Sequence, residues 1–303
     1  MFGFETVIIV LMEYYMIYLM LVLVGLCLGS FAGASVWRLR AYQLLGDKKS
    51  GEHIDASEYK DLEKLTKVSV ANDHSKCLHC SYALKWYDML PLVSWIFLRG
   101  KCRKCHKQIG YLEPIIELGV AAFFVLSFML WPYSLIGGIE IARFVLWLVA
   151  GVALAVLFAY DAKWSLLPDN INFTVIGIGL ANASILLLGS QNKLDILLNI
   201  IGSALILSGL YFVLYIISKG RWIGFGDIKL GLGLALLLAD WKLAFIALFA
   251  ANLVGCLIVI PAMITKKLKR DSHVPFGPLL IVGFVIAGLL GNYLVNLYFI
   301  NLV

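Results

Sequence analysis

The chain has 303 residues, of which 61% are hydrophobic and only 15% are charged, and its formal net charge is +6. Because an ordinary soluble domain is roughly 45–50% apolar, this composition excludes a soluble globular protein and indicates a polytopic membrane protein. Attraction to anionic membrane lipid is sufficient to explain the positive charge, so we expect no nucleic acid partner.

Long apolar runs follow one another along the chain, most of them near the roughly 20 residues that a bilayer core requires. We therefore expect an all-α fold with about eight transmembrane helices. The sixth run is short, which leaves seven spans and one re-entrant segment as the alternative. The expected domains are a first transmembrane helix (1–36), a cytoplasmic loop (37–111) and a transmembrane core (112–303). The runs cover residues 7–36, 112–131, 139–160, 170–189, 194–218, 228–239, 243–264 and 275–300.

The distribution of basic residues predicts the orientation in the membrane. Residues 37–111 hold fourteen Lys or Arg side chains. If this loop is cytoplasmic, 22 of the 25 basic residues lie inside, and only Arg143, Lys193 and Lys242 lie outside. The positive-inside rule therefore predicts a cytoplasmic loop, with both chain termini on the opposite side.

Two Cys-x-x-Cys pairs lie in this loop, Cys77 with Cys80 and Cys102 with Cys105. Such pairs supply four thiolates that converge tetrahedrally, so residues 77–105 are predicted to form a small zinc module. The zinc is expected to be structural, because four cysteines leave no open coordination position. The alternatives are two disulfides or free, redox-active thiols. Disulfides are disfavoured because the loop is expected to face a reducing compartment.

Two aspartates follow long apolar runs, Asp161 after the third and Asp227 after the fifth. A carboxylate in the membrane is costly, about 2.5–3.5 kcal/mol at mid-bilayer, so its presence calls for a function. Gly224 and Gly226 closely precede Asp227 and allow the backbone to bend and another segment to approach. Two adjacent aspartates share a proton, so that one acts as acid and the other as base, which predicts an aspartyl protease pair. The alternative is a transporter in which they bind a proton or cation.

Other polar or conformationally special residues accompany these runs. Glu117, about one turn into the second span, is either functional or paired with a basic or polar neighbour. Asp169 fits as the N-cap of the fourth helix. Pro275 and Gly277 open the last span and are expected to form a fixed bend that approaches the aspartates. The small residues between Gly29 and Ser35 predict close packing of the first helix.

Taken in order, these motifs make the chain similar to the type IV prepilin peptidases, whose Gly-x-Gly-Asp intramembrane aspartyl protease architecture resembles presenilin. The resemblance covers nearly everything except residues 41–75. It departs from the family pattern at Leu78, at Arg40 and in the long charged insertion that follows. The segments that support it are Gly29-Ser30-Phe31, Arg38-Leu39, both cysteine pairs, residues 86–88, 91–95 and 98–103, Glu117-Leu118, residues 161–169, 224–229 and 275–278.

The resemblance implies that Asp161 and Asp227 are the catalytic pair. It also implies prepilin and pseudopilin substrates with a short basic leader, cut on the cytoplasmic side of the bacterial inner membrane. Members of this family commonly N-methylate the new amino terminus with S-adenosylmethionine, an activity associated with the cysteine module and with Gly100 and Lys101. The oligomeric state is not predicted. The residues expected to support the catalytic pair are Gly224, Gly226, Lys229, Asp169, Glu117, Pro275 and Gly277.

Overall fold

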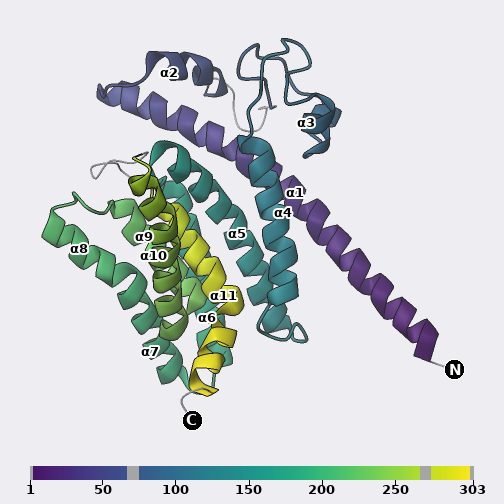
Figure 1. Cartoon of the computed structure of the whole chain (residues 1–303), viewed down its shortest axis with the longest axis vertical. Coiled ribbons are helices and arrows are strands. Elements are labelled where there is room, and N and C mark those ends of the chain that lie inside the picture. Colours follow the sequence, from purple (N-terminus) through teal and green to yellow (C-terminus); the bar gives the residue numbers. More distant parts are fainter. Residues whose placement is uncertain (1–2, 67–74, 267–273, 301–303) are drawn as a thin grey trace. The chain divides into compact units, whose positions relative to one another are not determined.

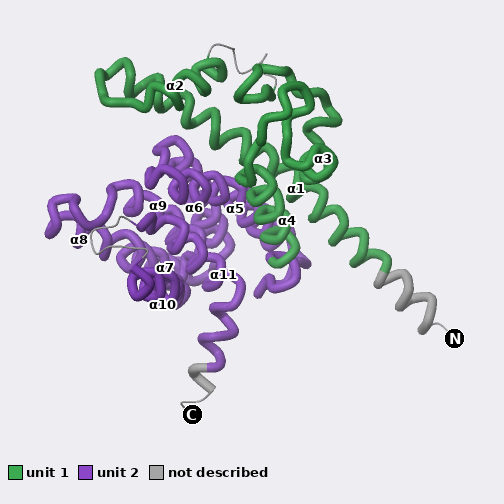
Figure 2. The backbone as a smooth tube through the Cα atoms, turned by 45° about the horizontal axis from the view of Figure 1, so that its top comes forward, with its two compact units in different colours: residues 1–126 green, residues 127–303 purple. Residues whose placement is uncertain are grey.

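The computed structural model describes residues 3–66, 75–266 and 274–300, with the backbone alone for residues 3–11 and 298–300. Within these residues the chain is helical and contains no β-strand, which confirms the all-α prediction (Figure 1). It divides into two compact units, unit 1 with residues 1–126 and unit 2 with residues 127–303 (Figure 2).

Unit 1 is built on the long helix α1 (Gly3–Ser50), which packs against α4 (Leu112–Leu130). A Cβ atom added at Gly25 would lie 2.7 Å from the Cα atom of Ala121, and one added at Gly29 would lie 2.6 Å from the Cα atom of Glu117. Glycine is therefore required at both positions, because any side chain there would push the two backbones apart. This contact confirms the close packing predicted for the small residues of the first helix.

The first helix does not end near residue 36, as its hydropathy predicts, but continues to Ser50. Beyond the apolar run, Ala41 and Leu44 are buried against Leu62 of the short helix α2 (Ala56–Leu62). The helix therefore outlasts the apolar run because its later turns bury side chains against protein. The remaining short helices of unit 1 are η1 (Glu63–Leu65), η3 (Trp86–Asp88) and α3 (Val93–Phe97).

Unit 2 is a helical bundle around the short helix α9 (Phe225–Leu238). Leu230, Leu234 and Ala235 of α9 are fully buried. A Cβ atom added at Gly231 would lie 2.1 Å from the carbonyl oxygen of Leu207, so the neighbouring backbone passes directly over this glycine. The other helices of the unit are α5 (Gly138–Trp164), α6 (Asp169–Gly189), α7 (Lys193–Ala204), the π-helical turn η4 (Leu205–Gly209), α8 (Leu210–Ser218), α10 (Trp241–Ile264) and α11 (Gly277–Ile300).

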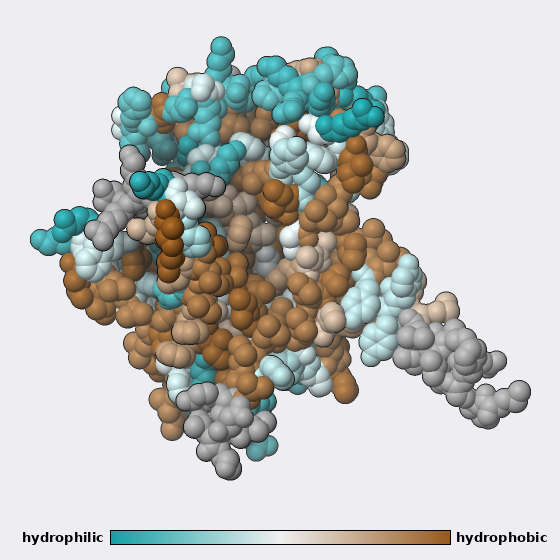
Figure 3. All heavy atoms as spheres, in the orientation of Figure 1, coloured by the Kyte–Doolittle hydropathy of each residue, from teal (hydrophilic) through white to brown (hydrophobic). Residues whose placement is uncertain are grey.

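Seven helical segments in the described part of the chain are long and apolar enough to span a membrane. All eight apolar runs are helical, but α9 has 14 residues and is about 21 Å long, shorter than a bilayer core of about 30 Å. The count of seven spans is therefore the better of the two alternatives that the sequence left open. Figure 3 shows hydrophobic side chains over most of the visible surface of unit 2, whereas hydrophilic ones gather over α2 and the loops that follow it in unit 1.

Candidate active site and cysteine centre

Asp161 lies in the last turn of α5 and is only 5% exposed. Hydropathy alone predicts that this helix ends at residue 160, but the helix continues to Trp164 and therefore contains the aspartate. Its Oδ2 atom accepts a hydrogen bond of 2.9 Å from the backbone N–H of Gly277, the first residue of α11. A Cβ atom at Gly277 would lie 2.7 Å from the same oxygen, so only glycine permits this contact. The segment that begins at the half-buried Pro275 thus approaches Asp161 and orients its carboxylate.

Asp227 lies in the first turn of α9, where its Oδ2 atom accepts a hydrogen bond of 3.2 Å from the backbone N–H of Gly224. This bond satisfies an N–H group that precedes the helix, and a carboxylate at a helix N-terminus is also favoured by the helix dipole. Asp227 is half-buried, in contrast to the buried Asp161. Its position is therefore fixed by the start of the helix.

Leu167 lies between the segments that hold the two aspartates. A Cβ atom added at Gly226 would lie 2.9 Å from the Cβ atom of Leu167, and one added at Gly277 would lie 3.3 Å from its Cδ2 atom. Gly226 directly precedes Asp227 in the sequence, and the backbone N–H of Gly277 is hydrogen-bonded to Asp161. The backbone around each aspartate therefore converges on the same leucine, and small residues make this approach possible.

An ion pair joins α6 and α9 beside Asp227. The Nζ atom of Lys229 lies 2.7 Å from the Oδ1 atom of Asp169. The prediction that Asp169 caps α6 is wrong, because the N-cap is Pro168 and Asp169 is already in the first turn. Its carboxylate instead pairs with the lysine that follows Asp227 by two residues, which helps to fix the start of α9.

Two buried polar side chains near Asp227 were not predicted from the sequence. Asn172 is fully buried and donates a hydrogen bond of 3.4 Å to the carbonyl oxygen of Gly226. Tyr211 is 4% exposed, interacts electrostatically with Asp227, and packs its ring edge-on against Phe276 with centroids 5.4 Å apart. A polar residue inside an apolar run is a signal that would have singled out Asn172. Tyrosine gives no such signal, because it is common in apolar runs.

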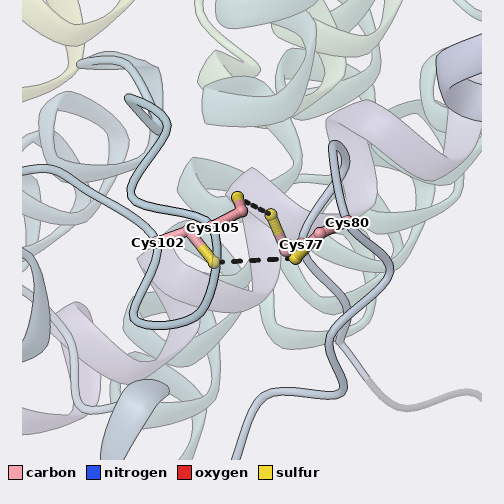
Figure 4. A group of neighbouring side chains, drawn as sticks. All are labelled: Cys77, Cys80, Cys102 and Cys105. Atoms are coloured by element: carbon pink, nitrogen blue, oxygen red, sulfur yellow. Dashed lines mark hydrogen bonds between the residues drawn. The ribbon is translucent and has the colours of Figure 1, made fainter.

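The four cysteines of the loop come together in unit 1, with their sulfur atoms directed toward one another from two loops (Figure 4). The Sγ atoms of Cys77 and Cys105 are 3.9 Å apart, as are those of Cys80 and Cys102. All four ligand atoms lie within 4.8 Å of one another. Four sulfur atoms at the usual Zn–S distance of about 2.3 Å form a tetrahedron with edges of about 3.8 Å. The cluster therefore fits a metal ion of that kind.

The two cysteine loops have the same backbone structure. In the first, the N–H of Cys77 bonds to the carbonyl of Tyr82, and in the second the N–H of Cys102 bonds to that of Lys107. Each loop closes on a residue with positive φ, Ser81 at 57° and His106 at 56°. Equal spacing in the sequence thus produces two matching turns, each presenting a pair of sulfur atoms.

The protonation of these thiols is shaped by the turns. Burial raises the pKa of Cys77 to about 12. Burial also raises the pKa of Cys102. At this residue, however, the backbone N–H groups of Cys105 and Lys104 donate hydrogen bonds to the sulfur. Together with the neighbouring thiols, these bonds outweigh burial and lower the pKa to about 7. The backbone N–H groups around Cys102 therefore favour its thiolate, which is the form that binds metal.

Three residues with a predicted role also lie in unit 1. Glu117 is 6% exposed and accepts a hydrogen bond of 2.7 Å from the backbone N–H of Leu92. Of the two predicted alternatives, a functional glutamate or one paired with a polar neighbour, the structure therefore contains the polar neighbour. Gly100 has a φ of +67°, and a Cβ atom there would lie 3.0 Å from the ring of Trp95. Lys101 is exposed at the start of the second cysteine loop.

Two protein families match successive parts of the chain. The family described as bacterial peptidase A24 N-terminal domain matches residues 23–131, and the type IV leader peptidase family matches residues 148–260. The first match contains the cysteine centre, and the second contains both aspartates. No solved structure matches the chain significantly.

Several proteins with assigned names are similar to the chain over most of its length. The type 4 prepilin-like proteins leader peptide-processing enzyme of Escherichia coli O78:H11 is 30% identical over 264 residues, which are 86% of this chain and 88% of that protein. The prepilin leader peptidase/N-methyltransferase of Aeromonas hydrophila is 30% identical over 75% of each chain, and that of Pseudomonas aeruginosa is 25% identical over 91% of each chain. With both family matches in order and this similarity over nearly the whole length, the chain belongs to the type IV leader peptidase family of membrane enzymes.

Proposed function

We propose that the protein removes the leader from type IV prepilins or secretion pseudopilins by aspartyl catalysis, and that it N-methylates the new amino terminus. The observation that best supports the catalytic assignment is the contact between Gly277 and the buried Asp161, together with the packing of Gly277 and Gly226 against the same Leu167. The relatives that cover most of the chain are named for both activities.

In the proposed mechanism, Asp161 and Asp227 hold one proton between them. The ionised carboxylate accepts a proton from water as the water attacks the scissile carbonyl group, and the protonated one donates to the carbonyl oxygen. The leaving amine then takes a proton from the pair, so no covalent intermediate is formed. The Gly277 and Gly224 N–H groups hold the two carboxylates in place during these transfers.

Zinc is the metal that best suits the cysteine centre, because four thiolates in a tetrahedron are its usual structural ligands. Cys77, Cys80, Cys102 and Cys105 would hold it, and it would stabilise the fold of the module without taking part in a reaction. We also propose that the loop of residues 37–111 and the aspartates face the cytoplasm of the inner membrane. This orientation places most basic side chains inside and exposes the site to a basic leader before export.

Mass spectrometry of a purified prepilin incubated with the detergent-solubilised protein and S-adenosylmethionine tests this function. We expect loss of the leader and the gain of one methyl mass at the new amino terminus. Cleavage without methylation would remove the transferase from the proposal. An uncleaved prepilin would favour the transporter alternative, in which the same carboxylates carry a proton or cation.

Replacing Gly277 with alanine is expected to slow leader cleavage by about 10²-fold, because displacing a catalytic group by about 1 Å is known to have effects of this size. The new methyl group would meet the Oδ2 atom of Asp161 at 2.7 Å and force the carboxylate to move. Initial rates of cleavage measure the effect. Gly177→Ala is the matched control, because a Cβ atom there has no neighbour within 4 Å. Equal rates for the two variants would contradict the assigned role of the contact.

A further inference from the structure

A cavity of about 450 Å³ lies inside unit 1, among α1, the cysteine loops and the start of α4. Small-molecule sites in proteins are typically cavities of roughly 300–1,000 Å³ with mostly apolar walls and a few polar groups, so this one has a suitable size. Neither aspartate of unit 2 takes part in it. The side chains that line it include Trp37, Arg38, Lys76, Trp95, Glu113 and Glu117.

Two carboxylates at one end of this cavity have neutral partners only. Glu113 and Glu117 are one helical turn apart on α4 and therefore lie on the same face of the helix. The Oε1 atom of Glu113 accepts a hydrogen bond of 2.8 Å from the indole N–H of Trp37, and Glu117 accepts from the Leu92 backbone and the Ser30 side chain. No described cation forms an ion pair with either glutamate.

The second oxygen of Glu113, Oε2, is buried and has no hydrogen-bond partner among the described residues. A buried polar atom without a partner is costly, and a carboxylate oxygen is among the costliest. With Glu117 close enough to add like-charge repulsion, this end of the cavity is suited to a ligand that brings a positive charge.

The wall of the cavity is suited to a planar ring. The indole N–H of Trp95 donates a hydrogen bond of 2.8 Å to the carbonyl of Gly110, and its ring packs against Tyr111 with centroids 5.4 Å apart. The same ring lies against Gly100, where a side chain would collide with it. Gly100 does not line the cavity itself, so its effect there is to allow the position of Trp95.

We propose that this cavity binds the methyl donor S-adenosylmethionine, an inference that depends on the N-methyltransferase function proposed above. The positively charged sulfonium group of the donor lies at Glu113 and its ammonium group lies at Glu117, while its purine ring stacks on Trp95. Arg38 and Lys76, which also line the cavity, provide positive charge for the donor's carboxylate. This arrangement assigns donor binding to glutamates on α4 rather than to Lys101, which does not line the cavity.

The charge of the donor makes the proposal testable. When the methyl group is transferred, the C–S bond breaks and its electron pair stays on sulfur, so S-adenosylhomocysteine carries a neutral thioether in place of the sulfonium. An amine nitrogen that has first lost a proton gains the methyl group and the positive charge. The two glutamates should therefore bind the donor more tightly than the product, because only the donor has the sulfonium charge.

Isothermal titration of the full-length protein in detergent, with each of the two compounds, tests the site directly. Glu113→Gln has the same shape as the native residue but no charge, and we expect it to weaken binding of S-adenosylmethionine by at least ten-fold while changing that of S-adenosylhomocysteine by less than three-fold. Trp95→Leu should weaken both compounds to a similar degree, because ring stacking does not depend on the methyl group. Glu52→Gln removes an exposed carboxylate of the same unit and serves as the control.

The possible outcomes separate this site from the proposed function. If Glu113→Gln and Glu117→Gln both bind the donor as the native protein does, and the native protein methylates cleaved prepilin, then the site is wrong and the function stands. If Glu113→Gln loses both compounds equally, the charge-based assignment is wrong. If the native protein cleaves prepilin but transfers no methyl group, the proposed methyltransferase function fails, and the site fails with it. Thermal unfolding of each variant, compared with that of the native protein, shows that the chain is folded.

Discussion

Asp227→Asn and Asp161→Asn are each expected to reduce leader cleavage by about 10³-fold or more. An amide cannot share a proton with the remaining aspartate, so the pair loses either its acid or its base, and general acid–base catalysis alone contributes about 10²–10⁴-fold. Both substitutions keep the shape of the side chain and leave an oxygen that accepts the hydrogen bond from Gly224 or Gly277. The loss should therefore be one of chemistry rather than of folding.

Cleavage of a purified prepilin by each detergent-solubilised variant measures this loss, and thermal unfolding of the same samples measures stability. Asp195→Asn is a suitable control, because Asp195 is an exposed aspartate in the first turn of α7 and has no part in the proposed site. If either site variant retains more than a tenth of the native rate while its melting temperature is unchanged, the aspartyl mechanism is wrong for this protein.

Features of the fold that depend on local sequence could be predicted well. The cysteine pairs formed matching loops because each turn is determined by a few consecutive residues, and the apolar runs formed helices because a bilayer-length run has few other conformations available. The helix ends were predicted less well. Hydropathy falls at Trp37 and at Asp161, yet α1 continues to Ser50 and α5 to Trp164. The later turns of α1 bury side chains against the protein, and the last turn of α5 contains the buried Asp161.

Features that depend on tertiary contacts could not be predicted. Nothing in the sequence places Tyr211 near Asp227, or joins the indole of Trp37 to Glu113 across 76 residues. Glu117 was singled out as a buried glutamate, but its position in unit 1, bonded to Leu92, depends on how the cysteine loops fold over α4. Of the basic cluster from Lys266 to Arg270, whose side chains are predicted to be cytoplasmic, the residues from 267 on lie outside the described residues.

Removal of the metal should have the largest effect on structure. A structural zinc ion contributes about 10–16 kcal/mol of binding free energy to a small module of this kind, which buries too little apolar surface to fold without it. We expect Cys102→Ser to release the metal, because a hydroxyl group is a poor ligand for zinc and Cys102 is the buried member of the four. The two loops would then separate, although the Asp88–Arg103 ion pair of 2.7 Å would still connect the second loop to η3.

Metal analysis of the purified protein, combined with brief digestion by trypsin, measures both consequences. The native protein should contain one zinc ion per chain and resist cleavage in the module, although Lys101, Lys104 and Lys107 are exposed there. Cys102→Ser, or the native protein after treatment with a strong chelator, should lose the metal and be cut at these lysines. Cys256→Ser changes an exposed cysteine of an apolar helix and should do neither. A metal-free native protein whose module is equally resistant to trypsin would show instead that the loops fold through their own hydrogen bonds, since the matching turns around Ser81 and His106 would then be stable without a metal ion.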